Sequence, residues 1–298
     1  MSARERAAIL SELTPPYLVH QPDQILHPFV FSSPHSGRVY PKAFLEDSRL
    51  PAATLRKSED AFVDELFREV TKLGAPMIAA RFPRAYLDVN REPYELDPEL
   101  FEERLPDFAN TRSLRVVGGL GTIARVVAES EEIYRRPLTV EAAFERINRL
   151  YKPYHAELGQ LLTAARRTFG TAVLIDCHSM PSAGSGQPGQ RPHIVLGDRF
   201  GSSCHPALTR FLQGELVKLG YEVALNRPYA GGFITEHYGN PSLGVHALQI
   251  EVNRSLYMHE ERFETTPGFY RVARDLRSIM ERVMIEATSL MVPRAAAE

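Results

Sequence analysis

Short apolar runs alternate with longer amphipathic segments through most of this chain, and this alternation limits the folds that it can adopt. The runs predicted as strands are "FVFSSPHSG", "APMIAARF", "AYLDVN", "TAVLIDCHS", "PHIVLGD", "YEVALN" and "HALQIEVN". Strands that alternate with helices of about a dozen residues predict a mainly parallel sheet with helices on both faces. We therefore expect an α/β fold.

The segments with helical spacing are 58–74, 139–169, 205–220 and 268–291. In the first of them, Ser58 is predicted as the N-cap and Gly74 as the residue that ends the helix. Pro153 is expected to bend or interrupt the second, because its ring removes a hydrogen-bond donor. The Gly-, Ser- and Pro-rich stretch 181–190 predicts a flexible loop. No internal repeat or clear linker divides the chain, so we expect a single domain over residues 1–298.

The composition is that of a soluble globular enzyme and excludes several other classes. A formal net charge of -2 gives no basic field for nucleic acid or an anionic membrane surface. No run approaches the roughly 20 apolar residues needed to span a bilayer, and the N-terminal segment lacks the apolar core of a secretory leader. Cys177 and Cys204 do not make a disulfide framework, which fits a reduced, cytoplasmic setting.

Polar and ionisable side chains gather where the predicted strands end. These residues are His35, Asp88, Asn90, Arg91, Asp176, His178 and Glu251. In open α/β sheets, sites form in the crevice beyond the carboxyl ends of the strands. A strand that only fills a core needs no such residues, so this edge of the sheet is the predicted site.

Two histidines and a nearby acid have the composition of a catalytic zinc site, which uses about three protein ligands and keeps one open position. A single histidine at a strand end is more often structural, but His35 and His178 both lie among small residues. Glu59 or Asp60 in "SED" could supply the carboxylate, or both acids could merely complement a helix dipole. Asp176 could accept the second ring proton of His178, or it could be a buried acid bonded to backbone donors.

Three arginines lie within eleven residues of otherwise apolar sequence, "RFPRAYLDVNR". Arg81, Arg84 and Arg91 could form a solvated basic edge, but bidentate binding of a carboxylate is a natural use of a guanidinium in such surroundings. Asn90 could add a neutral donor. Glu251, inside an apolar strand, is costly to bury unless it is paired, for example with Arg254, or acts as a base.

Other motifs are weaker. Cys177 lies beside His178, but neighbouring residues on a strand point to opposite faces, so a buried thiol is the better interpretation. "GGLG" at 118–121 lacks the Lys-Ser/Thr of a phosphate loop. Roles for His193 and His237 stay open.

The chain resembles the N-formylglutamate amidohydrolase family, within the wider zinc carboxypeptidase and aspartoacylase class. The matching segments are "SSPHSG", "SEDAFVDELF", "YLDVNREP", "DCHSM", "GGFITEHYG" and "HALQIEVNRSLYM", in family order from about residue 30 to 260. The resemblance implies a three-layer α/β/α fold around a central mixed, mainly parallel sheet, of phosphorylase/hydrolase-like and zinc carboxypeptidase-like type. It also implies one Zn²⁺ per chain.

By this resemblance the metal ligands are His35, Asp60 (preferred over Glu59) and His178. The implied catalytic residues are Glu251 as general base and Arg84 as the group that polarises the carbonyl. The implied substrate-binding residues are Asn90, Arg91, Arg81, Thr235 and Tyr238. Asp176 and Glu59 are implied to contact the metal ligands and not the metal. The sequence departs from the His-x-x-Glu ligand pair of carboxypeptidases, because Arg38 stands three residues after His35.

The implied activity is hydrolysis of a linear amide in an N-acyl amino acid that carries a carboxylate. N-formyl-L-glutamate, cleaved to formate and L-glutamate at the end of a route of histidine catabolism, is the first expectation. The alternatives are a related metallo-amidase for another N-acyl amino acid or small peptide, and a non-catalytic metal-stabilised amino-acid-binding protein. The exact acyl group and the oligomeric state stay open.

Overall fold

The computed structural model describes residues 2–127, 131–182 and 192–291, so most of the loop predicted at 181–190 lies outside the described residues. The chain divides into two compact units. Unit 1 is Met1–Leu18, Pro34–Ala61 and Ile78–Gly159, and unit 2 is Val19–Ser33, Phe62–Met77 and Gln160–Glu298. The single domain stays a prediction.

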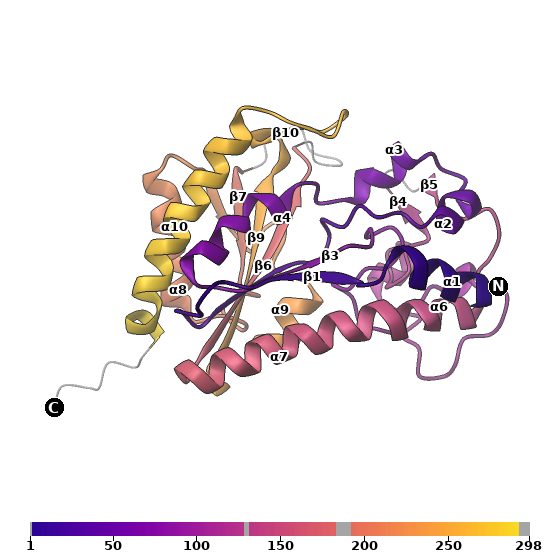
Figure 1. Cartoon of the computed structure of the whole chain (residues 1–298), viewed down its shortest axis with the longest axis horizontal. Helices are drawn as coiled ribbons and strands as arrows, with labels where there is room; N and C mark the ends of the chain where they lie inside the picture. The colour runs from indigo at the N-terminus through magenta and orange to yellow at the C-terminus, as the bar shows by residue number, and fades with distance from the viewer. Residues whose placement is uncertain (1, 128–130, 183–191, 292–298) are drawn as a thin grey trace. The chain divides into compact units, whose positions relative to one another are not determined.

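Within the described ranges, seven strands form the main sheet in the order β1-β3-β2-β6-β9-β7-β8 (Figure 1). They are β1 (Tyr17–His20), β2 (Phe29–Ser33), β3 (Met77–Ala80), β6 (Ala172–Met180), β7 (Ile194–Gly197), β8 (Val223–Leu225) and β9 (Val245–Asn253). β6 pairs in parallel with both β2 and β9, whereas β7 runs antiparallel to β9 and parallel to β8. This mixed, mainly parallel sheet confirms the predicted α/β class.

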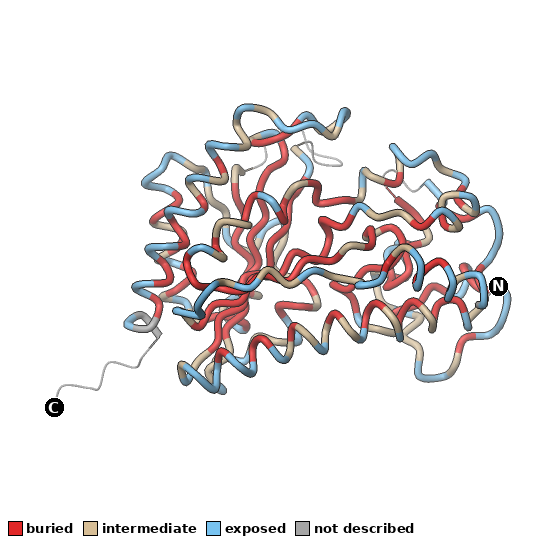
Figure 2. Tube along the Cα trace, viewed as in Figure 1, coloured by how far each residue is buried: buried red, intermediate tan, exposed pale blue. Residues whose placement is uncertain are grey.

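The middle of the sheet is the core of unit 2. All residues of β2 and β6 are buried, and so are those of β9 after its first residue, as Figure 2 shows by colour. Strands covered on both faces have nearly continuous apolar sequences, which explains runs such as "AVLI". Polar residues in these strands therefore stand in an apolar environment.

Two long helices of unit 2 pack against each other beside the strands, α8 (Pro206–Lys218) and α10 (Gly268–Met291) (Figure 1). Buried Glu215 of α8 joins them through Arg282 of α10, with Nη1–Oε2 at 2.5 Å. His205 begins α8, because its side chain accepts a hydrogen bond from the Ala207 amide. The bounds of α10 match the predicted helix at 268–291.

The other helices are mostly short. The α-helices are α1 (Ser2–Glu12), α2 (Lys42–Asp47), α3 (Ala52–Leu55), α4 (Val63–Leu66), α5 (Leu114–Val117), α6 (Val140–Arg146), α7 (Lys152–Phe169) and α9 (Phe233–Tyr238). Among the described residues, the 3₁₀ turns are η1 (Arg56–Ser58), η2 (Arg68–Leu73), η3 (Pro98–Leu100), η6 (Pro241–Leu243) and η7 (Arg254–Leu256), and η5 (Ile147–Tyr151) is a π-helix. Two small antiparallel pairs are β4–β5 (Val126–Val127 with Glu131–Glu132) and β10–β11 (Met258–His259 with Glu264–Thr265).

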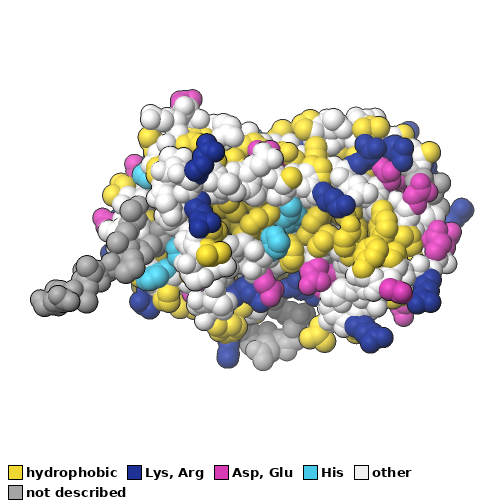
Figure 3. Space-filling model, turned by 90° about the horizontal axis from the view of Figure 1, so that it is seen from below, with side chains coloured by type: hydrophobic (Ala, Val, Ile, Leu, Met, Phe, Trp, Pro, Cys, Tyr) yellow, Lys and Arg dark blue, Asp and Glu magenta, His cyan; other side chains and the backbone are white. Residues whose placement is uncertain are grey.

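None of the helices in the described part of the chain is long and apolar enough to cross a membrane. On the face drawn in Figure 3, Lys and Arg side chains are scattered among Asp and Glu side chains, in keeping with the small net charge.

Two predicted elements are wrong. The continuous helix over 58–74 breaks into η1, α4 and η2, because Phe62 takes a left-handed φ of 65°. Ser58 does not cap it, since its hydroxyl donates to the Leu55 carbonyl at 2.8 Å. The predicted strand "AYLDVN" is a series of turns. Gly74 does end the segment, with φ at 86°.

The interruption predicted near Pro153 is confirmed. The helix over 139–169 consists of α6, the wider turn η5 and α7. Thr139 caps its start by accepting from the Ala142 amide. The wide turn ends two residues before Pro153, where the ring would otherwise crowd the preceding turn of the helix.

Candidate functional site

In unit 2, two neighbouring strands place four polar side chains on one face of the sheet. His178 is the register partner of Glu251, and Asp176 is the partner of Gln249. Paired residues of parallel strands point to the same side, as do residues two apart on one strand. All four are buried in the core of the sheet. Cys177 points to the opposite face, where burial raises the pKa of its thiol well above the ordinary value, as expected for a structural cysteine.

The ring of His178 is fixed by a carboxylate. Its Nε2 lies 2.9 Å from Asp176 Oδ2, and the other carboxylate oxygen accepts the Ser32 hydroxyl at 3.2 Å. A carboxylate at Nε2 selects the tautomer with its proton on that nitrogen. Asp176 thus contacts the ring of His178 as predicted, whereas the ligand role of His178 stays a prediction.

Glu251 is oriented by Gln249, a residue that the sequence analysis missed. The Gln249 Nε2 donates to Glu251 Oε1 at 2.8 Å, and its Oε1 accepts the Gly232 amide at 2.8 Å. Gln249 stands two residues before Glu251 in an otherwise apolar strand, which was a usable signal. The neighbouring Gly231 has φ at 120°, a conformation that favours glycine.

Thr235 and Tyr238, predicted at the pocket, lie on the short helix α9 of unit 2. The Thr235 hydroxyl donates to the Gly232 carbonyl at 2.8 Å, so it stabilises the start of that helix. Burial raises the pKa of the Tyr238 phenol, which therefore stays protonated. Their binding of substrate stays a prediction.

In unit 1, His35 lies between two carboxylates. Its Nε2 is 2.7 Å from Asp88 Oδ1, and its Nδ1 is 3.4 Å from Asp60 Oδ2. The Asp60 amide also donates to the His35 carbonyl at 3.0 Å. Two residues later, Gly37 lets the chain pack closely on the backbone of Arg81 and Phe82, with which a Cβ at that position would collide.

The two acids of "SED" have different surroundings. Asp60 faces the His35 ring, whereas the Glu59 carboxylate accepts the Tyr40 hydroxyl at 2.6 Å and Arg56 Nε at 3.2 Å. Burial raises the pKa of Glu59. The geometry therefore favours Asp60 as the partner of His35.

Asp88 is a second residue to which the sequence analysis gave no role. Its carboxylate contacts His35 and also accepts Arg84 Nε at 2.9 Å and the Asn90 amide at 2.8 Å. Burial alone would raise its pKa, but Arg91, His35 and Arg84 together hold it well below the usual range. Asp88 is thus an anion at neutral pH, and Arg84 is oriented by it.

The other two predicted arginines, Arg91 and Arg81, donate hydrogen bonds to backbone carbonyls. Arg91 donates from Nε to the Leu120 carbonyl at 2.9 Å and from Nη1 to the Asn90 carbonyl at 2.8 Å, and burial lowers its pKa to about 10. Arg81 donates to the Pro15 carbonyl at 2.6 Å. The carboxylate clamp predicted for these residues stays a prediction.

The chain belongs to the N-formylglutamate amidohydrolase family, whose family model matches residues 27–258. It is therefore an amidohydrolase, as the six sequence segments predicted. A curated relative from Pseudomonas putida, named N-formylglutamate deformylase, is 31% identical over 248 residues, which cover 82% of this chain and 85% of the relative.

A second relative of that name, from Pseudomonas aeruginosa, is 28% identical over 267 residues. The match covers 86% of this chain and 91% of the relative. Among solved structures, the N-formylglutamate amidohydrolase of Ralstonia eutropha JMP134 is 35% identical with a TM-score of 0.87, and the match covers 92% of this chain and 99% of that one.

Proposed function

We propose that this amidohydrolase cleaves N-formyl-L-glutamate to formate and L-glutamate, with one Zn²⁺ held by His35, Asp60 and His178. Two curated relatives named N-formylglutamate deformylase match most of the chain, which supports the substrate. The observation that carries the metal site is that each histidine has a carboxylate at the same ring atom, Nε2.

The donor set fits zinc. Metal-ligating histidines almost always donate their other ring N–H to a carboxylate, carbonyl or water, which orients the ring and makes it a better ligand. Asp88 and Asp176 occupy that place, so each imidazole would ligate through Nδ1. Two imidazoles and one carboxylate are a common set for catalytic zinc, and His35, Asp60 and His178 are all buried.

The covalent chain also favours a shared site. Ser32 on β2 is the register partner of Asp176 on β6. His35 follows Ser32 by three residues and His178 follows Asp176 by two, and a chain spans at most about 3.6 Å per residue. Both histidines thus come from neighbouring strand ends, where α/β proteins bind their ligands.

When bound, zinc would polarise the amide carbonyl and lower the pKa of water toward about 7. Glu251, held by Gln249, would take a proton from the attacking water and deliver it to the leaving nitrogen. Arg84, oriented by Asp88, would stabilise the negative charge that develops on the carbonyl oxygen. The substrate would be held by Asn90, Arg91, Arg81, Thr235 and Tyr238. These roles stay predictions, as do the cytoplasmic location and the place in histidine catabolism.

Metal content and formate release test this proposal together. We expect about one zinc per chain in the purified protein, formate from N-formylglutamate, and loss of metal in His35→Ala and His178→Ala. His259→Ala, on the β10–β11 hairpin, is the matched control and should keep its metal. Full zinc occupancy in His178→Ala would remove that residue from the ligand set.

A panel of N-formyl, N-acetyl and N-succinyl amino acids distinguishes the alternatives. Preference for another acyl group would favour a related metallo-amidase. Binding of the amino acid with no hydrolysis in the presence of zinc would favour a binding protein.

A further inference from the structure

The π-turn η5, which lies in unit 1, brings three side chains onto one face. Residues five apart on an α-helix point about 140° away from each other. In a π-turn, whose hydrogen bonds join i to i+5, residues five apart come close to the same face. Because η5 spans Ile147–Tyr151, it aligns Arg146 with Tyr151, and His155 follows four residues later.

All three side chains donate to carbonyl oxygens of one irregular segment, residues 86–91. Arg146 Nη1 donates to the Tyr86 carbonyl at 3.1 Å, and the Tyr151 hydroxyl donates to the Arg91 carbonyl at 2.7 Å. His155 Nε2 lies 2.8 Å from the Val89 carbonyl, so it carries the proton in that contact. These bonds replace the strand ladder that the segment lacks.

Residues 120–122 also bond to the segment. The Asp88 amide donates to the Thr122 carbonyl at 2.8 Å, and the Arg91 side chain donates to the Leu120 carbonyl. Asp88, which contacts His35, and Asn90 both belong to the segment that these two sets of bonds hold. Tyr151 and His155 bond the carbonyls on either side of Asn90.

We propose that the π-turn is a positioning device, and that Tyr151 and His155 are positioning residues that set Asn90 for substrate binding. This inference rests on the proposed function, because the role of Asn90 does. π-turns within α-helices occur frequently at functional sites. Here the turn supplies the five-residue spacing that puts Arg146 on the face of Tyr151, whereas Tyr151 and His155 have the ordinary four-residue spacing of an α-helix.

The simplest alternative is packing alone. The centroids of the Tyr151 and His155 rings lie 4.3 Å apart, and both side chains bond to the segment 86–91. Packing would be unaffected by loss of the Tyr151 hydroxyl alone. An effect that depends on Asn90 therefore separates positioning from packing.

Tyr151→Phe removes the hydroxyl and keeps the ring. We expect the KM for N-formylglutamate to rise about 3- to 10-fold, the range for one lost hydrogen bond, with kcat changed less and zinc content unchanged. Tyr17→Phe is the matched control, because it removes a tyrosine hydroxyl bonded to Glu157 on the same helix but not to segment 86–91. It should leave KM unchanged.

A double-mutant cycle tests whether Tyr151 acts through Asn90. In an Asn90→Ala background, Tyr151→Phe should raise KM no further. His155→Leu should behave as Tyr151→Phe does, and His155→Gln, whose amide can still donate to Val89, should restore most of the lost affinity. Equal effects of Tyr151→Phe in both backgrounds, or equal effects of the two Tyr→Phe variants, would overturn the proposal.

Hydrogen exchange separates this proposal from the proposed function. The amides of Asp88 and Asn90 are bonded to Thr122 and to the Asp88 carboxylate. Their exchange should be faster in Tyr151→Phe than in wild type and Tyr17→Phe, whatever the protein hydrolyses. Failure of wild type to release formate would refute the proposed function, whereas unchanged exchange in Tyr151→Phe would refute the positioning role.

Discussion

The strand pair β6–β9 and the irregular segment 86–91 both carry candidate site residues, but different forces hold them. Asp176, His178 and Glu251 stand on continuous strands whose backbone ladder fixes their spacing. Asp88 and Asn90 stand on turns. Side chains of the helix over 139–169 donate to the backbone carbonyls of these turns, and arginine side chains hold the Asp88 carboxylate.

Because of this difference, substitutions in the two regions are expected to affect activity and stability to different extents. A polar substitution on β6 or β9 leaves the backbone ladder intact, so we expect it to change stability little. A substitution in segment 86–91 removes contacts that also define the backbone. The following predictions test this contrast.

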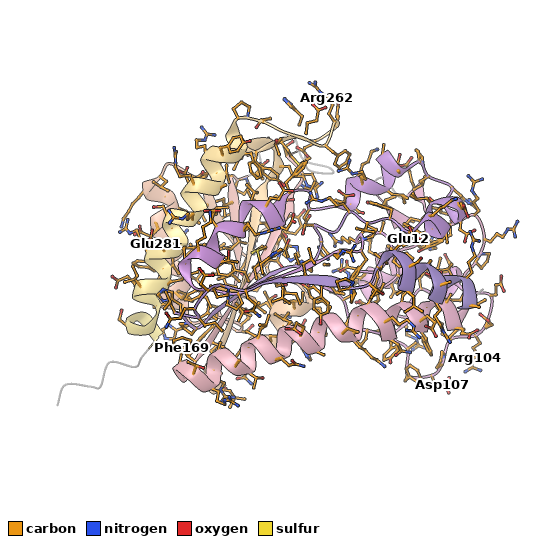
Figure 4. The ribbon with its side chains drawn as sticks, viewed as in Figure 1. Glu12, Arg104, Asp107, Phe169, Arg262 and Glu281 are labelled. Carbon is orange, nitrogen blue, oxygen red and sulfur yellow. The ribbon has the colours of Figure 1, made fainter. Side chains whose placement is uncertain are left out.

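The largest effect is expected from Glu251→Gln on β9. Loss of the proposed general base should lower kcat for formate release by about 10²- to 10⁴-fold, with zinc content and thermal stability close to wild type. Glu281→Gln on α10, an exposed residue labelled in Figure 4, is the control and should be fully active. Near-normal turnover by Glu251→Gln would exclude the base role.

Asp88→Asn and Asp176→Asn make the same change in the two regions. Each should weaken zinc binding by about 10- to 100-fold, because each removes the carboxylate behind one histidine. Asp88→Asn should also cost the metal-free protein about 3–5 kcal/mol, because buried Arg91 loses its anion. Asp176→Asn should cost about 1 kcal/mol.

Metal titration and urea denaturation of the metal-free variants measure both quantities. Equal losses of stability in Asp88→Asn and Asp176→Asn would contradict the contrast between the strand pair and the segment.

The effect that is smallest at neutral pH is a pH dependence from His246 on β9. Burial lowers the pKa of His246 to about 4, and its Nδ1 accepts the His205 amide. An unfolded histidine, with its pKa near 6.5, binds a proton that the native one does not, so stability should fall as pH falls from about 6.5 to about 4. Asp88, with its lowered pKa, loses its contribution only below about 3.8, the ordinary aspartate value.

Denaturation of metal-free protein at several pH values checks this prediction. His246→Gln, which keeps an acceptor for the His205 amide, should flatten the slope between pH 6.5 and 4. An unchanged slope would show that the stability loss comes from other groups.

The strands β2, β3, β6, β7, β8 and β9 and the helices α8 and α10 follow from local sequence. A strand buried on both faces is a nearly continuous apolar run, and the buried face of a helix repeats every 3.6 residues. Polar residues such as His178 and Glu251 are conspicuous in these apolar strands, and they lie in the segments that carry the family resemblance.

Tertiary structure decided the rest. Asp60 and Glu59 are adjacent acids that residue type and spacing alone do not distinguish, although the family resemblance prefers Asp60. In the structure, the positions of His35, Tyr40 and Arg56 distinguish them. The turns at 86–91 resemble a strand in sequence because their apolar residues alternate, yet donors from 60 residues away, Tyr151 and Arg146, hold the backbone otherwise. A local pattern records which side chains are buried, whereas the partner of a buried polar group comes from wherever the fold brings a donor within about 3 Å.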